Sequence, residues 1–160
     1  MSCDAAALAL TLRLASFDLS ADAPRLIRSL ASVPQPGAAN PLAREPLFAS
    51  IVSGAGRLRD RVDTLRKAPG APSPAAVAKL EADASALAAL DMQGHVTLAA
   101  RGTDGDLKCI LKGIAQDMPR KLAALREAAA PDRRHAAFDE LWFLLRDNVE
   151  VITAPPQPAA

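Results

Sequence analysis

The sequence predicts an all-α protein, a compact bundle of about five helices with proline-rich connections. Half of the 160 residues are hydrophobic, many of them alanine, and alanine has the highest helix propensity of all residues. Prolines gather near residues 34–46, 69–74 and 155–158 and leave stretches of helical length between them. Within these stretches large apolar residues recur every three or four positions, which is typical of a helix with one buried face.

The first clear helix is predicted over residues 45–67, where two glycines, Gly54 and Gly56, interrupt an apolar stripe. A glycine inside a helix costs about 1 kcal/mol relative to alanine, so these two predict either a close helix crossing or a break. The stripe consists of Leu47, Ile51, Ala55, Leu58, Val62 and Leu65.

The second helix is predicted to begin after Ser73, whose hydroxyl can cap it, and to run from Pro74 to about Met92. Gly94 gives a possible stop. Its apolar face consists of Val77, Leu80, Ala84, Leu87 and Leu90.

A third helix is predicted to start at Thr103 or Asp104, with a kink or a new helix at Pro119. The last helix opens at Pro131 and continues to residue 152. We therefore expect one helical domain over residues 1–152, followed by a disordered proline-rich tail over residues 153–160.

A small sheet is the alternative interpretation, which would make the fold α+β. Leucines alternate with other residues over 8–14, and the segments 95–101 and 107–112 flank Asp104-Gly105, a favoured hairpin turn. We favour helix for all three segments because leucine and alanine are strong helix formers and β-branched residues are few.

Overall charge and composition exclude several classes of partner. The net charge is +1 and aromatic residues make up 3% of the chain, so neither a strong field nor stacking platforms are available for nucleic acid. Arg13 interrupts the apolar stretch near the start, and no basic segment precedes it. We expect no nucleic-acid partner, no membrane partner and a cytoplasmic location, and the richness in Ala, Arg and Pro indicates a bacterial source.

The two cysteines, Cys3 and Cys109, lie far apart and belong to no paired-cysteine motif. This spacing favours two reduced thiols.

Four residues offer the best catalytic or metal-binding candidates. His135 and Asp139 are spaced i, i+4 and would share a helix face, while Asp104 and Asp106 flank a glycine. A metal-dependent enzyme or ligand-binding protein using these four residues is the alternative function. Because two ligands do not make a site and helix capping explains the aspartates, we expect no catalytic residue, no metal and no cofactor.

The densest basic run consists of Arg57, Arg59, Arg61, Arg66 and Lys67. These residues spread around a helix instead of lining one side, which favours a solvated surface over a nucleic-acid interface.

The C-terminal helix carries more large apolar surface than one stripe needs. Phe138, Trp142 and Phe143 lie within six residues, and the last two are adjacent, so they point in different directions. Burial on two sides would explain this helix as a central core element. The leading hypothesis is a non-enzymatic adaptor, chaperone-like or regulatory protein that binds another protein or its own copy through these three residues.

Overall fold

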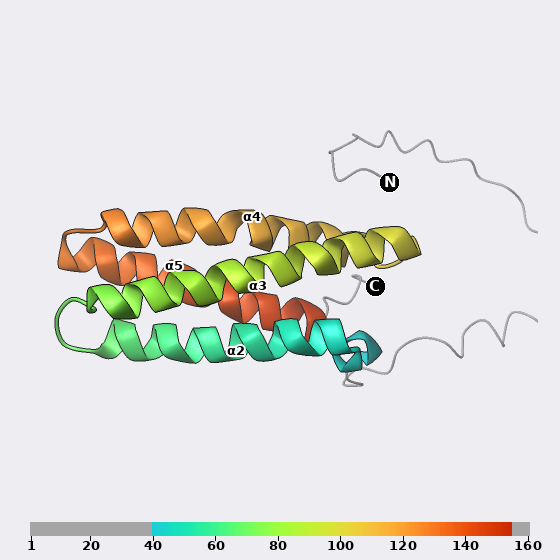
Figure 1. The fold of residues 1–160 in the computed structure, drawn as a ribbon, viewed down its shortest axis with the longest axis horizontal. Coiled ribbons are helices and arrows are strands. Elements are labelled where there is room, and N and C mark those ends of the chain that lie inside the picture. The colour runs from blue at the N-terminus through green and yellow to red at the C-terminus, as the bar shows by residue number, and fades with distance from the viewer. Residues whose placement is uncertain (1–39, 155–160) are drawn as a thin grey trace, which may run out of the picture. The chain divides into compact units, whose positions relative to one another are not determined.

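The computed structural model describes residues 40–154, which belong to one compact unit (Figure 1). In this part of the chain all regular structure is helical, so the predicted all-α bundle is confirmed. Residues 8–14, for which helix was favoured, lie outside the described residues, as does most of the predicted tail. The described elements are a short 3₁₀ helix η2 (Pro41–Arg44), α2 (Pro46–Lys67), α3 (Pro74–Arg101), α4 (Gly105–Glu127) and α5 (Pro131–Thr153).

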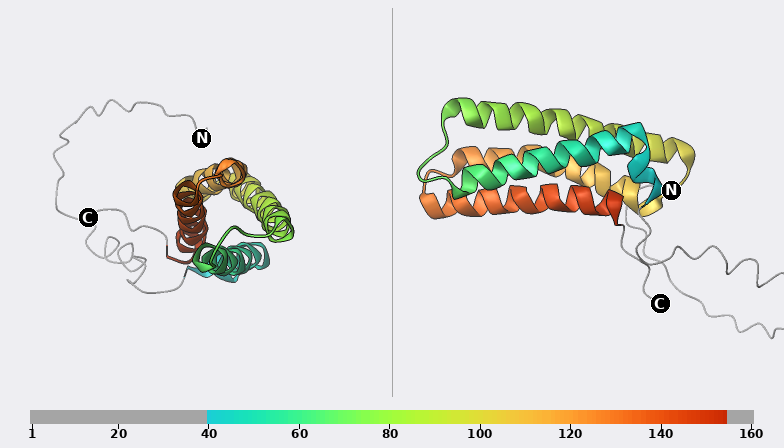
Figure 2. Two further views of the ribbon diagram at one scale, coloured as in Figure 1. Left: turned by 90° about the vertical axis from the view of Figure 1, so that its left-hand side faces the viewer. Right: turned by 90° about the horizontal axis from the view of Figure 1, so that it is seen from below.

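The four α-helices form an up-down-up-down bundle with short connections. Viewed along the axis, the helices occupy four corners (Figure 2). α2 packs against α3, α3 against α4 and α4 against α5, and α5 closes the bundle against α2. In this arrangement α2 lies diagonally opposite α4, and α3 lies diagonally opposite α5. Short loops between antiparallel neighbours are the simplest connectivity for such a bundle.

Local sequence signals set most of the helix ends. Proline occupies the first turn of α2, α3 and α5, where its missing N–H has no intrahelical partner to lose. The Ser73 hydroxyl accepts a hydrogen bond from the Ala76 N–H at 3.2 Å, as expected for a helix cap. Gly102 ends α3 in the left-handed conformation, with φ of 68°, which glycine adopts without strain.

Gly94 does not end the second helix, contrary to the prediction. α3 continues through Gly94 to Arg101, because the buried stripe is extended by Gly94 and Leu98. A Cβ atom at Gly94 would lie 3.0 Å from Leu111 Cδ1 and 3.2 Å from Ile51 Cδ1. The glycine therefore allows α2 and α4 to pack closely against α3.

The alternative sheet is wrong for its two described segments. Residues 95–101 are the end of α3, and residues 107–112 belong to α4. Asp104-Gly105 connects these two helices instead of a hairpin. Leu98, Leu107 and Leu111 are buried in the bundle. Their burial on the inner faces of two helices favours helix over strand for these segments.

α4 continues through Pro119 as a single helix. Proline removes one backbone hydrogen bond from α4, while Met118 and Leu122 on either side remain buried. The prediction that the segment stays helical beyond Pro119 is confirmed.

Asn40 joins the start of the described chain to the end of α5. Its side chain donates to the Ile152 carbonyl at 2.9 Å and accepts from the Leu42 N–H at 3.1 Å. Leu42 and Ile152 are both buried, so this polar contact closes one end of the core.

Cys109 is disulfide-bonded, so the expectation of a reduced thiol is wrong for this residue. Cys3 lies outside the described residues.

Candidate functional site

The three aromatic residues that the sequence placed at a partner surface lie at different depths. Phe138 is 2% exposed and belongs to the hydrophobic core, Trp142 is half-buried, and Phe143 is 48% exposed. The buried stripe of α5 follows Phe138, Leu141 and Leu145, and each residue along a helix turns by about 100°. Phe143, two positions after Leu141, therefore faces away from the core.

Trp142 is held between two arginines from different helices. The Arg66 guanidinium of α2 lies 5.1 Å from the centre of its ring, and that of Arg146 lies 5.9 Å from it. Phe143 packs edge-on against Trp142 with ring centres 5.3 Å apart, and Arg146 also lies 5.0 Å over the Phe143 ring. These contacts hold the Trp142 ring in one position on the bundle surface.

Acidic side chains position Arg66 over the tryptophan. Arg66 donates to Asp139 of α5 at 2.6 Å and to Asp63 of its own helix at 2.9 Å. The hydrogen bond to Asp139 is the main cause that raises the pKa of Arg66. Hydrogen bonds from Lys67 and Arg66 lower the pKa of Asp63. α2 and α5 are thus joined by an ion-pair network beside Trp142.

Phe143 lines a groove between α4 and α5 with a volume of about 530 Å³. Two neighbouring grooves of about 370 and 380 Å³ lie between the same helices and share lining residues with it. Ile110, Ile114 and Val151 extend the apolar lining towards the end of α5, and alanines extend it towards the loop before Pro131. The result is an elongated depression that follows most of the length of both helices, with Phe143 in its middle section. We call it the α4/α5 groove.

Acidic residues outnumber basic ones in the α4/α5 groove. Five of the acidic residues form ion pairs: Arg120 pairs with Asp117, Arg146 with Asp147 and Glu150, Lys121 with Glu140, and Arg66 with Asp139. Most of the negative charge is therefore neutralised, and Glu127 is the acidic lining residue that forms no ion pair among the described residues. The acidic lining residues are Asp117, Glu127, Asp139, Glu140, Asp147 and Glu150, and the basic ones are Lys121 and Arg133.

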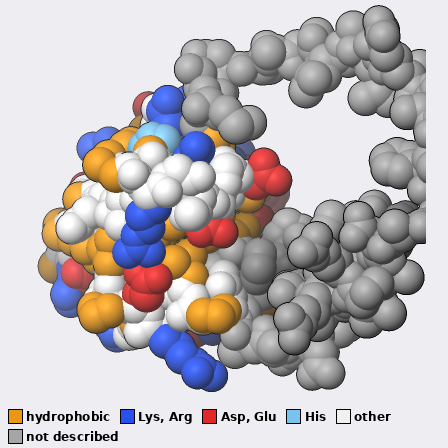
Figure 3. Space-filling model, turned by 90° about the vertical axis from the view of Figure 1, so that its right-hand side faces the viewer, with side chains coloured by type: hydrophobic (Ala, Val, Ile, Leu, Met, Phe, Trp, Pro, Cys, Tyr) orange, Lys and Arg blue, Asp and Glu red, His pale blue; other side chains and the backbone are white. Residues whose placement is uncertain are grey.

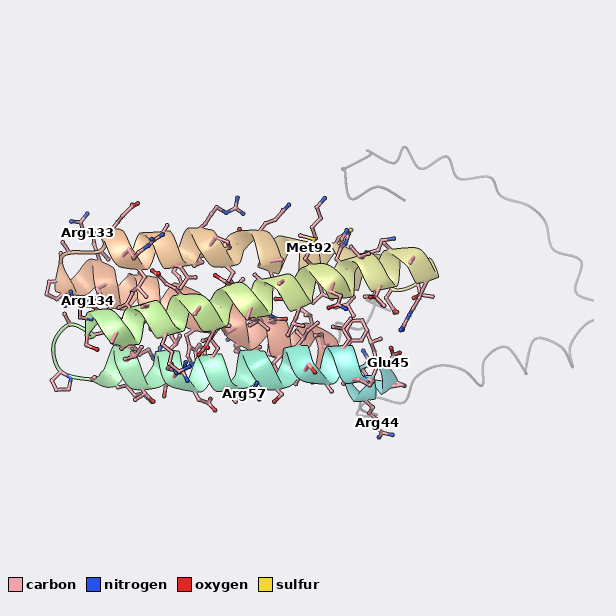
Figure 4. All side chains as sticks on the ribbon, in the orientation of Figure 1. Arg44, Glu45, Arg57, Met92, Arg133 and Arg134 are labelled. Atoms are coloured by element: carbon pink, nitrogen blue, oxygen red, sulfur yellow. The ribbon has the colours of Figure 1, made fainter. Side chains whose placement is uncertain are left out.

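The side chains of the basic run on α2 point in different directions and contact different partners. Arg57 and Arg61 line a groove of about 610 Å³ between α2 and α3, where Arg61 pairs with Asp83. Arg59 pairs with its neighbour Asp60, and Arg66 turns towards α5. Arginines are also dispersed along the bundle: Figure 4 places Arg57 midway along α2, with other labelled arginines at both ends. The expectation of no nucleic-acid partner remains a prediction.

The four residues of the metal-dependent alternative do not come together. Asp104 and Asp106 lie at the turn between α3 and α4, whereas His135 and Asp139 lie near the start of α5, at the other end of the bundle. A helix the length of α4 separates the two pairs, on the order of 30 Å. At the end that carries the first pair, acidic and basic side chains are interspersed (Figure 3).

His135 and Asp139 do approach each other, with Nε2 and Oδ2 3.5 Å apart, but Asp139 also binds Arg66. Over residues 40–154 there is no group of three or more His, Cys, Asp or Glu side chains placed to hold a metal ion. A single metal or catalytic site built from all four residues is therefore excluded by their positions.

The sequence interpretation missed a polar pair in the core. Asp91 of α3 and Asn148 of α5 are both 0% exposed, and Asn148 Nδ2 donates to Asp91 Oδ2 at 2.9 Å. Burial raises the pKa of Asp91 to about 7, while the hydrogen bond from Asn148 opposes the rise. A signal was present, since Asp91 continues the apolar stripe of Leu80 and Leu87, where a polar residue is unexpected.

Comparison with protein-family models, with curated proteins and with solved structures found no match to this chain. Among the described helices, none is long and apolar enough to span a membrane.

Proposed function

We propose that this protein is a non-enzymatic interaction module that binds an amphipathic helix of another protein in the α4/α5 groove. The exposed Phe143 side chain in the middle of this groove carries the proposal. Large aromatic side chains that stand out of a groove are the usual anchors of protein–protein interfaces. Trp142 and Arg146 hold the Phe143 ring in place, which lowers the entropy lost on binding.

The shape of the groove favours a helical partner. It lies between two antiparallel helices over most of their length, and apolar residues line it on both sides of Phe143. A helix with apolar residues at i, i+3, i+4 and i+7 buries one continuous stripe in such a groove.

The charge of the groove favours a basic partner over a second copy of this chain. If two copies met face to face through this groove, acidic lining would lie against acidic lining, which is unfavourable. Lysine or arginine beside the apolar stripe of the partner helix would instead meet Glu127, which forms no ion pair among the described residues.

Site-specific photo-crosslinking in the native cells tests the proposal with the full chain. p-Benzoylphenylalanine replaces Phe143 in one variant and Val96 in a matched control, because these are the two large hydrophobic residues most exposed among those described. We expect position 143, and not position 96, to crosslink to a segment of another protein with net positive charge and apolar residues three and four apart.

A peptide of the crosslinked segment is then titrated against the purified protein. Phe143→Ala is expected to weaken binding at least tenfold, while Val96→Ala leaves it unchanged. Crosslinks within the chain, crosslinks to a second copy, or equal yields at both positions would overturn the proposal.

We place this interaction in the cytoplasm, although a disulfide at Cys109 would be unusual there. Cell fractionation, with alkylation of free thiols before lysis, tests the location. Recovery with cytoplasmic markers is expected, and recovery with exported proteins would contradict it.

A further inference from the structure

The pair formed by Asp91 and Asn148 connects two helices that lie diagonally across the bundle (Figure 2). Both side chains are completely buried, and one hydrogen bond of 2.9 Å runs from Asn148 Nδ2 to Asp91 Oδ2. Ionisable side chains are rarely buried in this way unless a charge of opposite sign accompanies them.

Two oxygen atoms of the pair have no partner among the described residues. They are Asp91 Oδ1 and Asn148 Oδ1, both buried. With Asp91 ionised, both atoms are acceptors, and no donor reaches either. A buried carboxylate with an unpaired oxygen and no cation is a costly arrangement, because a charge loses far more hydration free energy than a neutral group.

A proton on Asp91 Oδ1 would remove the buried charge and provide a donor for Asn148 Oδ1. We propose that Asp91 is a neutral carboxylic acid in the folded protein and closes a ring of two hydrogen bonds with Asn148, so that the pair acts as a proton-dependent latch between α3 and α5. In this ring Asp91 Oδ1–H donates to Asn148 Oδ1, while Asn148 Nδ2–H donates to Asp91 Oδ2. Loss of the proton breaks the first bond and leaves a negative charge in the core.

The surroundings of Asp91 supply no charge that would favour the carboxylate. Of the ionisable side chains on the four helices, only Asp91 and Lys108 of α4 are buried, and Lys108 is not among the groups that shift the pKa of Asp91. On α3, His95 Nδ1 contacts the Lys108 carbonyl oxygen at 2.7 Å, and on α5, Asp147 and Glu150 pair with Arg146 at the surface.

No ionisable residue of α2 is buried. Burial and the Asn148 hydrogen bond are the causes that shift the pKa of Asp91, and no charged neighbour is among them. The latch is therefore expected to open as the pH rises through about 7. Since α5 carries both Asn148 and Phe143, its packing against the rest of the bundle would then depend on pH.

Carbon-13 NMR of the full chain, labelled at aspartate carboxyl groups, tests the protonation state directly. The carboxyl resonance of Asp91, assigned through its own backbone signals in the wild type, is expected to titrate near neutral pH. A titration midpoint near 4, or a chemical shift of the ionised form already at pH 5, would overturn the proposal.

Denaturant unfolding between pH 5 and pH 7 gives a second measurement. For the wild type the unfolding equilibrium constant should rise about tenfold for each pH unit, relative to Asp91→Asn, which keeps both hydrogen bonds without a titrating proton. Asp60→Asn, at a side chain that is 73% exposed, is the matched control and should follow the wild type. Parallel pH profiles for the wild type and Asp91→Asn would contradict the latch, and the NMR titration decides the matter if Asp91→Asn does not fold.

Discussion

The guanidinium of Arg66 lies 5.1 Å from the centre of the Trp142 ring, and this contact joins α2 to α5 at the bundle surface. Trp142 is the only tryptophan, so the tryptophan fluorescence of the protein reports on the surroundings of this ring. Arg66→Ala is expected to shift the emission maximum to longer wavelength, because the ring gains contact with water. Arg59→Ala, which removes an arginine paired only with its neighbour Asp60, should leave the spectrum unchanged. Identical spectra for both variants would show that Arg66 does not shield the ring.

Gly94 and Gly56 should respond to alanine in opposite directions. At Gly94 an added Cβ meets Leu111, Ile51 and Phe48 at 3.0, 3.2 and 3.4 Å, and relieving such crowding costs about 1–3 kcal/mol. At Gly56 nothing lies within 4 Å, so Gly56→Ala should raise the free energy of unfolding by up to about 1 kcal/mol. Urea denaturation of both variants checks this. Equal effects would mean that the close packing at Gly94 is absent.

Alanine substitutions at Phe138 and at Phe143 should change the free energy of unfolding by very different amounts. Phe138→Ala removes a side chain that is 2% exposed and should lower the free energy of unfolding by about 3–5 kcal/mol. Phe143→Ala should change it by less than about 0.5 kcal/mol, because the side chain is 48% exposed. Thermal or urea unfolding measures both. A large loss for Phe143→Ala would indicate a structural role and weaken its assignment as an anchor.

Asn40→Ala should destabilise the end of the bundle where α5 stops. The substitution removes the hydrogen bond to the Ile152 carbonyl and the cap on the Leu42 N–H, each worth about 1 kcal/mol. Amide hydrogen exchange should become faster in the last turn of α5, while exchange near Pro131 stays unchanged. Unchanged exchange in that last turn would contradict a role for Asn40 in holding it.

Stability should fall as the pH rises from about 4 to about 8. The unfolded chain releases the Asp91 proton near 3.8 and the folded chain near 7, so the folded state binds more protons in between. A difference of about 3 pKa units corresponds to at most about 4 kcal/mol, and all of it is lost above pH 7. Asp63 and Asp83, whose pKa values are lowered in the folded state, act in the opposite direction and lose their contribution as the pH falls below about 4. Denaturant midpoints measured from pH 3 to pH 8 should therefore pass through a maximum near pH 4–5, and a maximum above pH 7 would be inconsistent with a neutral Asp91.

Helix class and most helix starts could be predicted because their causes are local. Pro46, Pro74 and Pro131 lie in the first turns of α2, α3 and α5, where the sequence placed helix starts, and the apolar stripes predicted most of the buried residues. The prediction that Gly94 ends the second helix is wrong because it, too, used local signals alone. Locally a glycine after Met92 looks like a stop, and only the approach of Leu111 and Ile51 from other helices explains why the helix continues.

The candidate site was predicted only in part. The sequence pointed to Phe138, Trp142 and Phe143 together, and the tertiary structure separated them into a core residue, a residue held by arginines and an exposed residue in a groove. The α4/α5 groove itself could not be foreseen, since it is formed by two helices whose pairing the sequence does not state.

By itself, then, the sequence determined that this chain forms helices, where most of them begin and which residues share a helix face, because helical periodicity and capping act within a few residues. Only the tertiary structure decided which faces meet. Asp91 and Asn148 are 57 positions apart, and nothing in either segment predicts that a carboxyl group and an amide will face each other in the core. The physical reason is that periodicity gives the direction of a side chain from its own helix axis, whereas its partner, its burial and its pKa depend on how the axes pack.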